Sequence, residues 1–202
     1  MRALMAVAVP DVLHQVKRYL ARHGNKTDPN ALYIVTGGSN DAFFGLQKKP
    51  QPLKLANQVA TDLKHAEQQL AARGAKHLLV ATLPSSNRSP YAREYSGKLE
   101  QAALALYIHT FNNRVKRWAK QASARVSVVD LYEREEHILR HLQQYKLSNG
   151  KDACLVGTQK IEKKQRHLCA HPERHVYWDL YHPTAKMHGL FADAALEALR
   201  AE

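Results

Sequence analysis

The chain has 202 residues, a length typical of one domain, and 45% of them are hydrophobic, enough to build a sizeable core. Charged residues make up 24%, and no apolar run approaches the ~18 residues of a membrane-spanning helix, so the composition is that of a globular domain. The formal net charge of +12 attracts polyanions, either nucleic acid or anionic lipid surfaces.

The hydrophobic pattern alternates between helices and strands. Apolar residues recur at helical spacing in five segments, 11–23, 55–73, 96–121, 133–144 and 184–200. Short continuous apolar runs predict three strands, at 31–36, 77–83 and 125–131. Strands of this kind between helices indicate a parallel sheet covered on both faces, within one domain over residues 1–202. In such folds functional residues gather at the carboxyl ends of the strands.

Residues 146–177 break this pattern and contain both cysteines, Cys154 and Cys169. In a reducing compartment these are two free thiols, and in an oxidising compartment they are a disulfide; their spacing does not decide between the two. His167, His171 and His175 lie close by in sequence, which raises the possibility of a zinc site. Their spacing fits no standard zinc finger, so we expect no metal.

The first residues, Met1–Val9, resemble a signal peptide only weakly. The segment is short and leads directly into Pro10 and a helical pattern, without a clear cleavage site. We therefore expect these residues to belong to the mature chain.

Asp179 precedes His182 by three residues, just before the last predicted helix. A carboxylate at this distance can accept a proton from imidazole Nδ1, fix the tautomer and leave Nε2 as a general base. The same residues also suit the start of a helix, where Asp179 or Thr184 caps backbone N–H groups. The pair alone does not distinguish these interpretations.

Gly37-Gly38-Ser39-Asn40-Asp41 follows the first predicted strand. Glycines at such a place allow close approach of the backbone, and an asparagine amide there can donate hydrogen bonds to a developing oxyanion. The alternative is an ordinary turn after a strand, where Gly, Ser, Asn and Asp are common.

Together and in this order, Gly-x-Asn-Asp after a strand and Asp-x-x-His-Pro-Thr before a C-terminal helix resemble two signature blocks of the SGNH/GDSL ester hydrolases, in particular their lipase-like secreted branch. The resemblance spans nearly the whole chain. It implies a three-layer α/β/α sandwich with a parallel, flavodoxin-like sheet. It also implies that His182 is the catalytic base, that Asp179 orients it, and that Asn40, positioned by Gly38, donates to the oxyanion. The family pattern further implies a disulfide between Cys154 and Cys169.

The Gly-Asp-Ser block that carries the nucleophile in this family is absent from the sequence. The chain begins at the helix that normally follows this block, so we expect the sheet to lack its first strand or strands. Ser39 lies in the oxyanion block, and Ser85, Ser86 and Ser89 lie in a loop without family precedent. The chain is therefore interpreted as a fragment, as one half completed by another polypeptide, or as a degenerate binding module, and we favour the fragment.

The resemblance implies a carboxylic-ester hydrolase of the lipase, esterase or lysophospholipase type, working by Ser-His-Asp acyl transfer with the serine not in this chain and without a cofactor. Expected substrates are acyl esters or lipids, and a lipid acceptor in place of water makes it an acyltransferase. The expected location is secreted or periplasmic. The positive charge predicts contact with anionic membrane surfaces and no specific nucleic acid. The alternative is a non-catalytic basic module that binds anionic surfaces or nucleic acid.

Overall fold

The computed structural model describes residues 10–48 and 51–201, so the expectation for Met1–Val9 lies outside the described residues. The helices within these ranges are α1 (Val12–Arg22), α2 (Leu46–Lys48), α3 (Pro52–Ala71), α4 (Pro90–Tyr95), α5 (Lys98–Ala119), α6 (Leu131–Arg140) and α7 (Ala185–Arg200). The strands are β1 (Leu32–Val35), β2 (His77–Ala81), β3 (Arg125–Val129), β4 (Asn149–Ala153), β5 (Leu155–Val156), β6 (His167–Leu168) and β7 (His175–Tyr177).

The three predicted apolar runs form one parallel sheet in the order β1-β2-β3. The register pairs Leu32 with His77 and His77 with Arg125, so the carboxyl ends of all three strands lie at one edge of the sheet. The prediction of a parallel sheet is confirmed, and the loops after these strands are placed where α/β proteins gather their functional groups.

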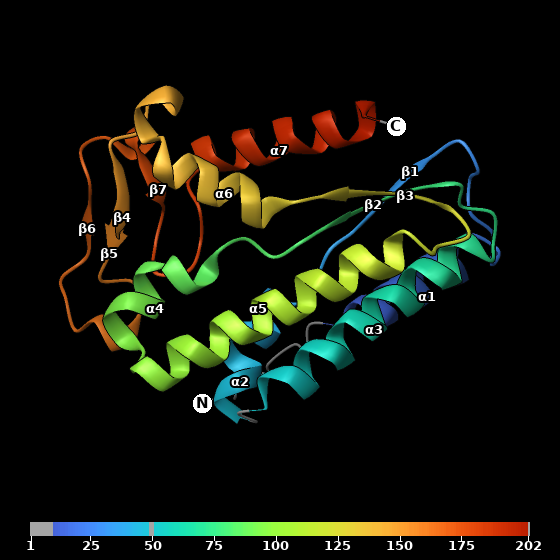
Figure 1. The fold of residues 1–202 in the computed structure, drawn as a ribbon, viewed down its shortest axis with the longest axis horizontal. Coiled ribbons are helices and arrows are strands. Elements are labelled where there is room, and N and C mark those ends of the chain that lie inside the picture. The colour runs from blue at the N-terminus through green and yellow to red at the C-terminus, as the bar shows by residue number, and fades with distance from the viewer. Residues whose placement is uncertain (1–9, 49–50, 202) are drawn as a thin grey trace, which may run out of the picture.

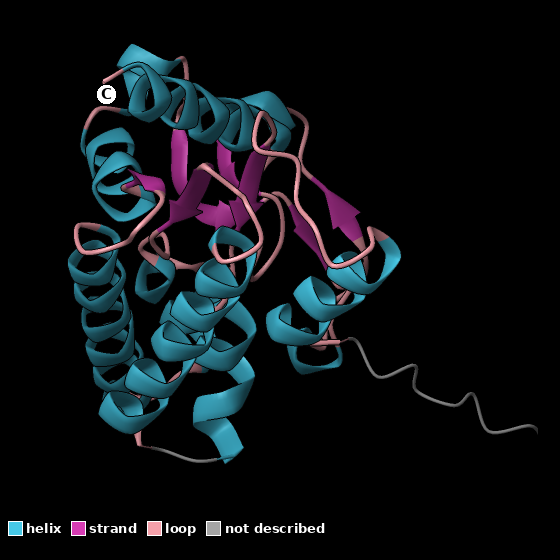
Figure 2. Ribbon diagram, turned by 90° about the vertical axis from the view of Figure 1, so that its right-hand side faces the viewer, coloured by secondary structure: helices cyan, strands magenta, loops and turns pink. Residues whose placement is uncertain are grey.

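Helices cover the sheet on two faces, which confirms the three-layer α/β/α arrangement (Figures 1 and 2). One face packs against α1, α3 and α5, with Tyr107, Phe111 and Val115 fully buried in the main core. The other face packs against α7, where Leu79 and Val129 meet Ala194 and its neighbours. This second helical layer covers β2 and β3.

Strand β1 is open on two sides. Among the described residues it pairs with β2 alone, so its other edge offers unpaired backbone groups. Val35 points into the main core, whereas Leu32 and Ile34 point to the opposite face and are 41% and 64% exposed. Strands of parallel sheets are normally buried on both faces. Strand β1 therefore departs from this rule at one edge and on one face.

Two sequence predictions need correction. The helix expected over 96–121 begins at Lys98, because Gly97 is extended and caps it, and the shorter helix α4 precedes it. Residues 146–177, expected to be irregular, contain the small sheets β4-β7 and β5-β6. These strands have two to five residues, and the apolar runs at 153–156 and 176–178 are shorter than those of the main sheet, so hydrophobic pattern gave only a weak signal.

Within residues 10–48 and 51–201, no helix is long and apolar enough to cross a membrane.

Candidate functional site

His182 and Asp179 form a compact unit in the loop between β7 and α7. The Nδ1 atom of His182 lies 3.0 and 2.9 Å from the two carboxylate oxygens of Asp179. Asp179 Oδ1 also accepts the backbone N–H groups of Tyr181 and His182, both at 2.8 Å. The Asp179 side chain is 14% exposed and that of His182 is 69% exposed. The carboxylate is thus fixed and mostly covered, while the imidazole is mostly exposed and its Nε2 atom is not used in the bonds to Asp179.

Both ends of this loop are attached to the fold. The backbone N–H of Trp178 donates to the carbonyl of His182 at 2.8 Å, which closes the turn around Asp179. Thr184 caps α7 by accepting from the N–H of Met187, and its hydroxyl donates to the carbonyl of His175 in β7 at 2.7 Å. The helix-cap interpretation is therefore correct for Thr184. Asp179 does not cap α7: its carboxylate bonds to the imidazole and to two N–H groups of the preceding turn.

Gly38 and Asn40 lie at the carboxyl end of β1. Gly38 has a φ of 102°, and a Cβ atom at this position would lie 3.1 Å from the ring of Phe111, so only glycine fits without strain. The hydroxyl of Tyr107 donates to the carbonyl of Gly38 at 3.1 Å. Asn40 begins the π-helical turn Asp41–Gly45 and is exposed. In the described part of the chain its side-chain amide makes no hydrogen bond, so its N–H groups can donate to a ligand.

Aromatic contacts connect these two segments. Tyr181, the residue before His182, packs edge-on against Phe43 with ring centroids 5.1 Å apart and lies 5.9 Å from Phe44. Phe43 and Phe44 follow Asn40 within the same π-helical turn. The structure therefore brings the loop of His182 and the turn of Asn40 to one side of the molecule, although they are about 140 positions apart in the sequence.

An apolar pocket of about 330 Å³ opens beside these aromatic residues. Phe43 and Tyr91, whose rings both contact Tyr181, form one wall. The remaining walls come from α2 and α5 and include Leu46, Leu99, Ala103 and Leu104. Sequence analysis did not identify this pocket. The adjacent phenylalanines Phe43 and Phe44, shortly after Asn40-Asp41, were the available signal.

Asp41 lies in a part of the site that water reaches poorly. Burial, reinforced by the neighbouring carboxylate of Asp62, raises the pKa of Asp41. Both residues line a small hollow of about 130 Å³ next to Gly37 and Gly38, at the carboxyl end of the open strand β1.

The serines considered as nucleophiles have other surroundings. Ser85 is buried, and both its N–H and its hydroxyl donate to Glu135, at 2.7 and 3.0 Å. Ser89 is buried and caps α4 by accepting the N–H of Ala92 at 3.2 Å. Ser39 is exposed in the turn before Asn40. Within residues 10–48 and 51–201 the Nε2 atom of His182 has no serine hydroxyl as a hydrogen-bond partner.

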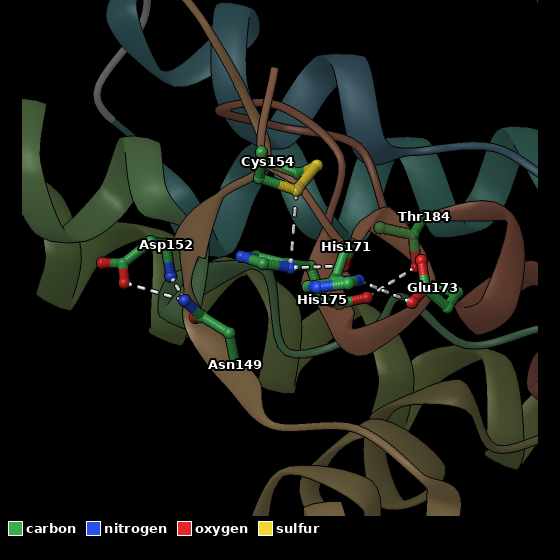
Figure 3. Close-up of a disulfide and its surroundings, with 8 residues drawn as sticks. Asn149, Asp152, Cys154, His171, Glu173, His175 and Thr184 are labelled. Atoms are coloured by element: carbon green, nitrogen blue, oxygen red, sulfur yellow. Dashed lines mark hydrogen bonds and ion pairs between the residues drawn. A yellow bond between two sulfur atoms is a disulfide. The ribbon is translucent and has the colours of Figure 1, made fainter. Parts of the chain in front are cut away.

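Cys154 and Cys169 form a disulfide with Cα atoms 4.8 Å apart (Figure 3). The Nδ1 atom of His175 lies 3.6 Å from Cys169 Sγ and 2.9 Å from the carbonyl of His171. These two sulfurs and His175 are close enough together to suggest metal ligands. Sulfur atoms bonded to each other are not thiolates, however, so this group cannot act as a zinc site while the disulfide is intact.

Comparison with known proteins gives a consistent result. The sequence model of the family described as GDSL-like Lipase/Acylhydrolase matches residues 4–195. The chain is 30% identical over 196 residues to an uncharacterized protein of the trpE-trpG intergenic region of Pseudomonas putida, covering 94% of this chain and 32% of that protein. It is 25% identical over 206 residues to a thermolabile hemolysin of Vibrio parahaemolyticus serotype O3:K6, covering 95% and 47%. A GDSL esterase/lipase of Arabidopsis thaliana is 21% identical over 188 residues, covering 86% and 52%. The chain thus spans about a third to a half of the length of these relatives.

Proposed function

Because the chain belongs to the GDSL-like lipase/acylhydrolase family, we propose that it is the base-carrying and substrate-binding part of a carboxylic-ester hydrolase whose serine lies outside these 202 residues. The main observation is the Asp179–His182 pair, in which both carboxylate oxygens hold Nδ1 of the imidazole, two backbone N–H groups hold the carboxylate, and the His182 side chain is exposed. In this mechanism Nε2 takes the proton of an incoming serine hydroxyl, and Asp179 stabilises the imidazolium that forms.

The role of hydrogen-bond donor to the oxyanion is assigned to the side-chain amide of Asn40. A preorganised donor stabilises the charge that develops on the carbonyl oxygen of the ester during attack. Asn40 suits this role because its turn is fixed by Gly38 below it and by Phe43 packed on Tyr181 beside it. The backbone conformation at Gly38 and the hydrogen bond from Tyr107 keep that turn in place.

The nucleophile is expected on a strand paired to the open edge of β1. A hollow of about 370 Å³ runs along this edge, lined by α1 and by β1 residues such as Tyr33 and Ile34. An additional parallel strand there would end next to Gly38 and Asn40, so a Gly-Asp-Ser block after it would face His182. Such a strand, together with a helix that covers the same face of the sheet, would also bury Ile34, which is 64% exposed.

The substrate is expected to be an acyl ester with an apolar chain. The pocket beside Tyr181 is lined mostly by Phe, Tyr, Leu and Ala side chains. Its volume of about 330 Å³ is roughly twice that of the ~150 Å³ apolar cavity that holds one benzene molecule, so it suits a medium acyl chain better than an acetyl group. Lysophospholipids and short-chain to medium-chain esters therefore rank ahead of sugar acetates. With water as the acceptor of the acyl group the enzyme is a hydrolase, and with a lipid alcohol as the acceptor it is an acyltransferase.

The disulfide supports a secreted or periplasmic location, because such bonds persist in oxidising compartments.

The test compares three proteins in a p-nitrophenyl ester assay with organophosphate labelling. They are the 202-residue chain, the chain extended at its N-terminus by a strand with a Gly-Asp-Ser block, and the same extended chain with the serine of that block replaced by alanine. We expect turnover and labelling in the second protein alone. Brisk turnover and labelling of the 202-residue chain would place the nucleophile within it and overturn the proposal. Ser39 would then be the first place to look for the label, because Ser85 and Ser89 are buried in other contacts.

A further inference from the structure

The loop between β5 and β6 has a fixed shape although it lies at the surface. Its one buried side chain, Glu162, accepts the backbone N–H groups of Gly157, Thr158 and Gln159 at 2.9, 2.9 and 2.7 Å. The base of the loop is closed by the pairing of β5 with β6 and by the disulfide (Figure 3). A loop held in this way presents its outward side chains in a preorganised arrangement, which lowers the entropic cost of binding.

The outward side chains of this loop include a cluster of basic residues and two apolar residues. The exposed basic residues are Lys160, Lys163, Lys164 and Arg166. Ile161, at the tip, is 45% exposed, and Leu168 is exposed at the base. Residues 157–168 contain no Phe, Tyr or Trp. We refer to residues 157–168 as the basic loop.

The basic loop lies next to the candidate site. Lys164 Nζ is 3.6 Å from a carboxylate oxygen of Glu94 in α4, and in Figure 1 the orange segment joining β5 and β6 reaches α4. Tyr91 of the same helix donates its N–H to the carbonyl of Leu180 at 3.0 Å. Burial, with the neighbouring Tyr91, Asp179 and Glu162, raises the pKa of Tyr181, so the buried carboxylate of the loop is within electrostatic range of the residue before His182.

Apolar side chains surround the adjacent pocket. Leu99, at the start of α5, lines the pocket and is 87% exposed, and Phe44 is exposed beside Tyr181. A cluster of basic residues next to exposed apolar residues at the mouth of an apolar pocket is the pattern of a surface that binds at a membrane–water interface.

We propose that the basic loop binds an anionic lipid surface and so places the pocket beside Tyr181 against the lipids that supply its acyl chain. The placing of the pocket against its substrate lipids rests on the proposed function, whereas the binding of the basic loop to an anionic surface does not. Lipid is favoured over nucleic acid, because single-stranded nucleic acid is held largely by stacking on aromatic side chains, and His167 is the only aromatic ring in the loop. The exposed Ile161 and Leu168 suit insertion among headgroups and add nothing to a phosphate contact.

A second basic region provides a matched control. Lys64 of α3 and Arg114 and Arg117 of α5 line a groove of about 560 Å³ between the two helices. Arg117 is 18 residues after Leu99 on the same helix, which corresponds to roughly 27 Å along its axis. One variant can therefore lose three positive charges in the basic loop, and a second variant can lose three in the distant groove. Both variants then have the same net charge.

The experiment measures sedimentation with vesicles made of phosphatidylglycerol and phosphatidylcholine in equal parts. One variant carries Lys160→Gln, Lys163→Gln and Arg166→Gln, and the other carries Lys64→Gln, Arg114→Gln and Arg117→Gln. Each basic residue near an anionic surface contributes about a fivefold gain in affinity, so the loop variant should bind roughly 100-fold more weakly. The groove variant should bind nearly as well as the unchanged protein. Ile161→Ser should remove the part of the binding that survives high salt.

Three results overturn the proposal. If vesicle binding is weakened equally in both variants, the overall positive charge of the protein, and not the loop, attracts it to the vesicles. Unchanged binding of the loop variant excludes the loop directly. Tighter binding to single-stranded DNA than to the vesicles, lost in the loop variant, shows that the loop serves a nucleic acid. Sedimentation needs no turnover, so a failure here leaves the ester hydrolysis of the extended protein standing, and the reverse also holds.

Discussion

The two sides of the candidate site differ in how complete they are. The side with His182 is closed on itself: Asp179 makes its bonds to the imidazole and to two backbone N–H groups within four residues. The side with Asn40 is open, since it follows a strand whose outer edge and one face lack partners among the described residues. The difference is the one that the proposed function requires, in which the base is preorganised by local bonds and the nucleophile is supplied by a neighbouring strand.

The two sides should also respond differently to the addition of a strand next to β1. The closed side should keep its geometry in the 202-residue chain, because its hydrogen bonds need no further segment. The open side should gain order and lose exposed apolar surface when a strand is added. Open sheet edges also favour association between chains, which gives a second reason to expect that the edge of β1 is covered in the working protein.

The largest effect is expected from the closed side in the extended protein. His182→Ala removes the base and should lower kcat by about 10⁴-fold to 10⁶-fold, and Asp179→Asn, which favours the wrong tautomer, should lower it by about 10⁴-fold. The measurement is p-nitrophenyl ester turnover with circular dichroism as a check of folding. His188→Ala, one turn into α7 from Thr184, is the control and should leave kcat nearly unchanged. A loss below tenfold for His182→Ala would exclude it as the base.

The open side should give a smaller effect. Asn40→Ala removes one oxyanion donor from the extended protein and should lower kcat by about 10²-fold to 10³-fold with little change in KM. Ser39→Ala, in the adjacent exposed position, is the matched control. If Asn40→Ala raised KM and left kcat unchanged, Asn40 would hold the substrate and not the transition state.

The sequence predicted the parts of this fold that depend on local pattern. Each continuous apolar run became a strand of the parallel sheet, because a strand buried on both faces needs apolar side chains in both directions. The Asp179–His182 contact was predictable for a similar reason, since a turn of three residues can connect the two groups without help from the rest of the chain.

The remaining features depend on contacts between distant segments. The pocket unites Phe43, Tyr91 and Leu104, which have ordinary core character when considered singly. Strand β4 pairs with β7 across residues 154–174, which are mostly polar. Glu162 and Glu135 are buried, although glutamate normally lies at the surface, and their roles become visible only with the backbone groups they accept from.

The disulfide should matter for stability more than for chemistry. It closes a loop with a sequence separation of 15, which corresponds to roughly 3 kcal/mol in the chain-entropy model. Replacing both cysteines, Cys154→Ser with Cys169→Ser, should lower the free energy of unfolding in urea by about this amount, while the Asp179–His182 loop keeps its bonds. Thiol titration of the unfolded, unreduced protein tests the bond itself, and two reactive thiols per chain would contradict it.

The smallest expected effect concerns Glu135, which lies behind the closed side. Its carboxylate accepts two hydrogen bonds from Ser85 and lies close to Tyr177, the last residue of β7 before the Trp178–His182 turn. Desolvation by burial raises its pKa to about 7, against the hydrogen bonds from Ser85, which lower it. Glu136, whose carboxylate meets Arg88 at 2.5 Å, adds a repulsive charge from the same helix.

The direction of the pH effect follows from this shift. Between about pH 4.5 and 7 the folded protein holds a proton on Glu135 that the unfolded chain has lost, so the free energy of unfolding should fall as the pH rises, by at most about 3 kcal/mol. Glu135→Gln should flatten this slope, because the amide does not titrate, whereas Glu133→Gln, an exposed position on α6, should leave it in place. The measurement is urea unfolding at several pH values from 5 to 8. An equal slope in the unchanged protein and in Glu135→Gln would show that Glu135 is ionised throughout, and the closed side would then rest on a buried charge stabilised by the hydrogen bonds from Ser85.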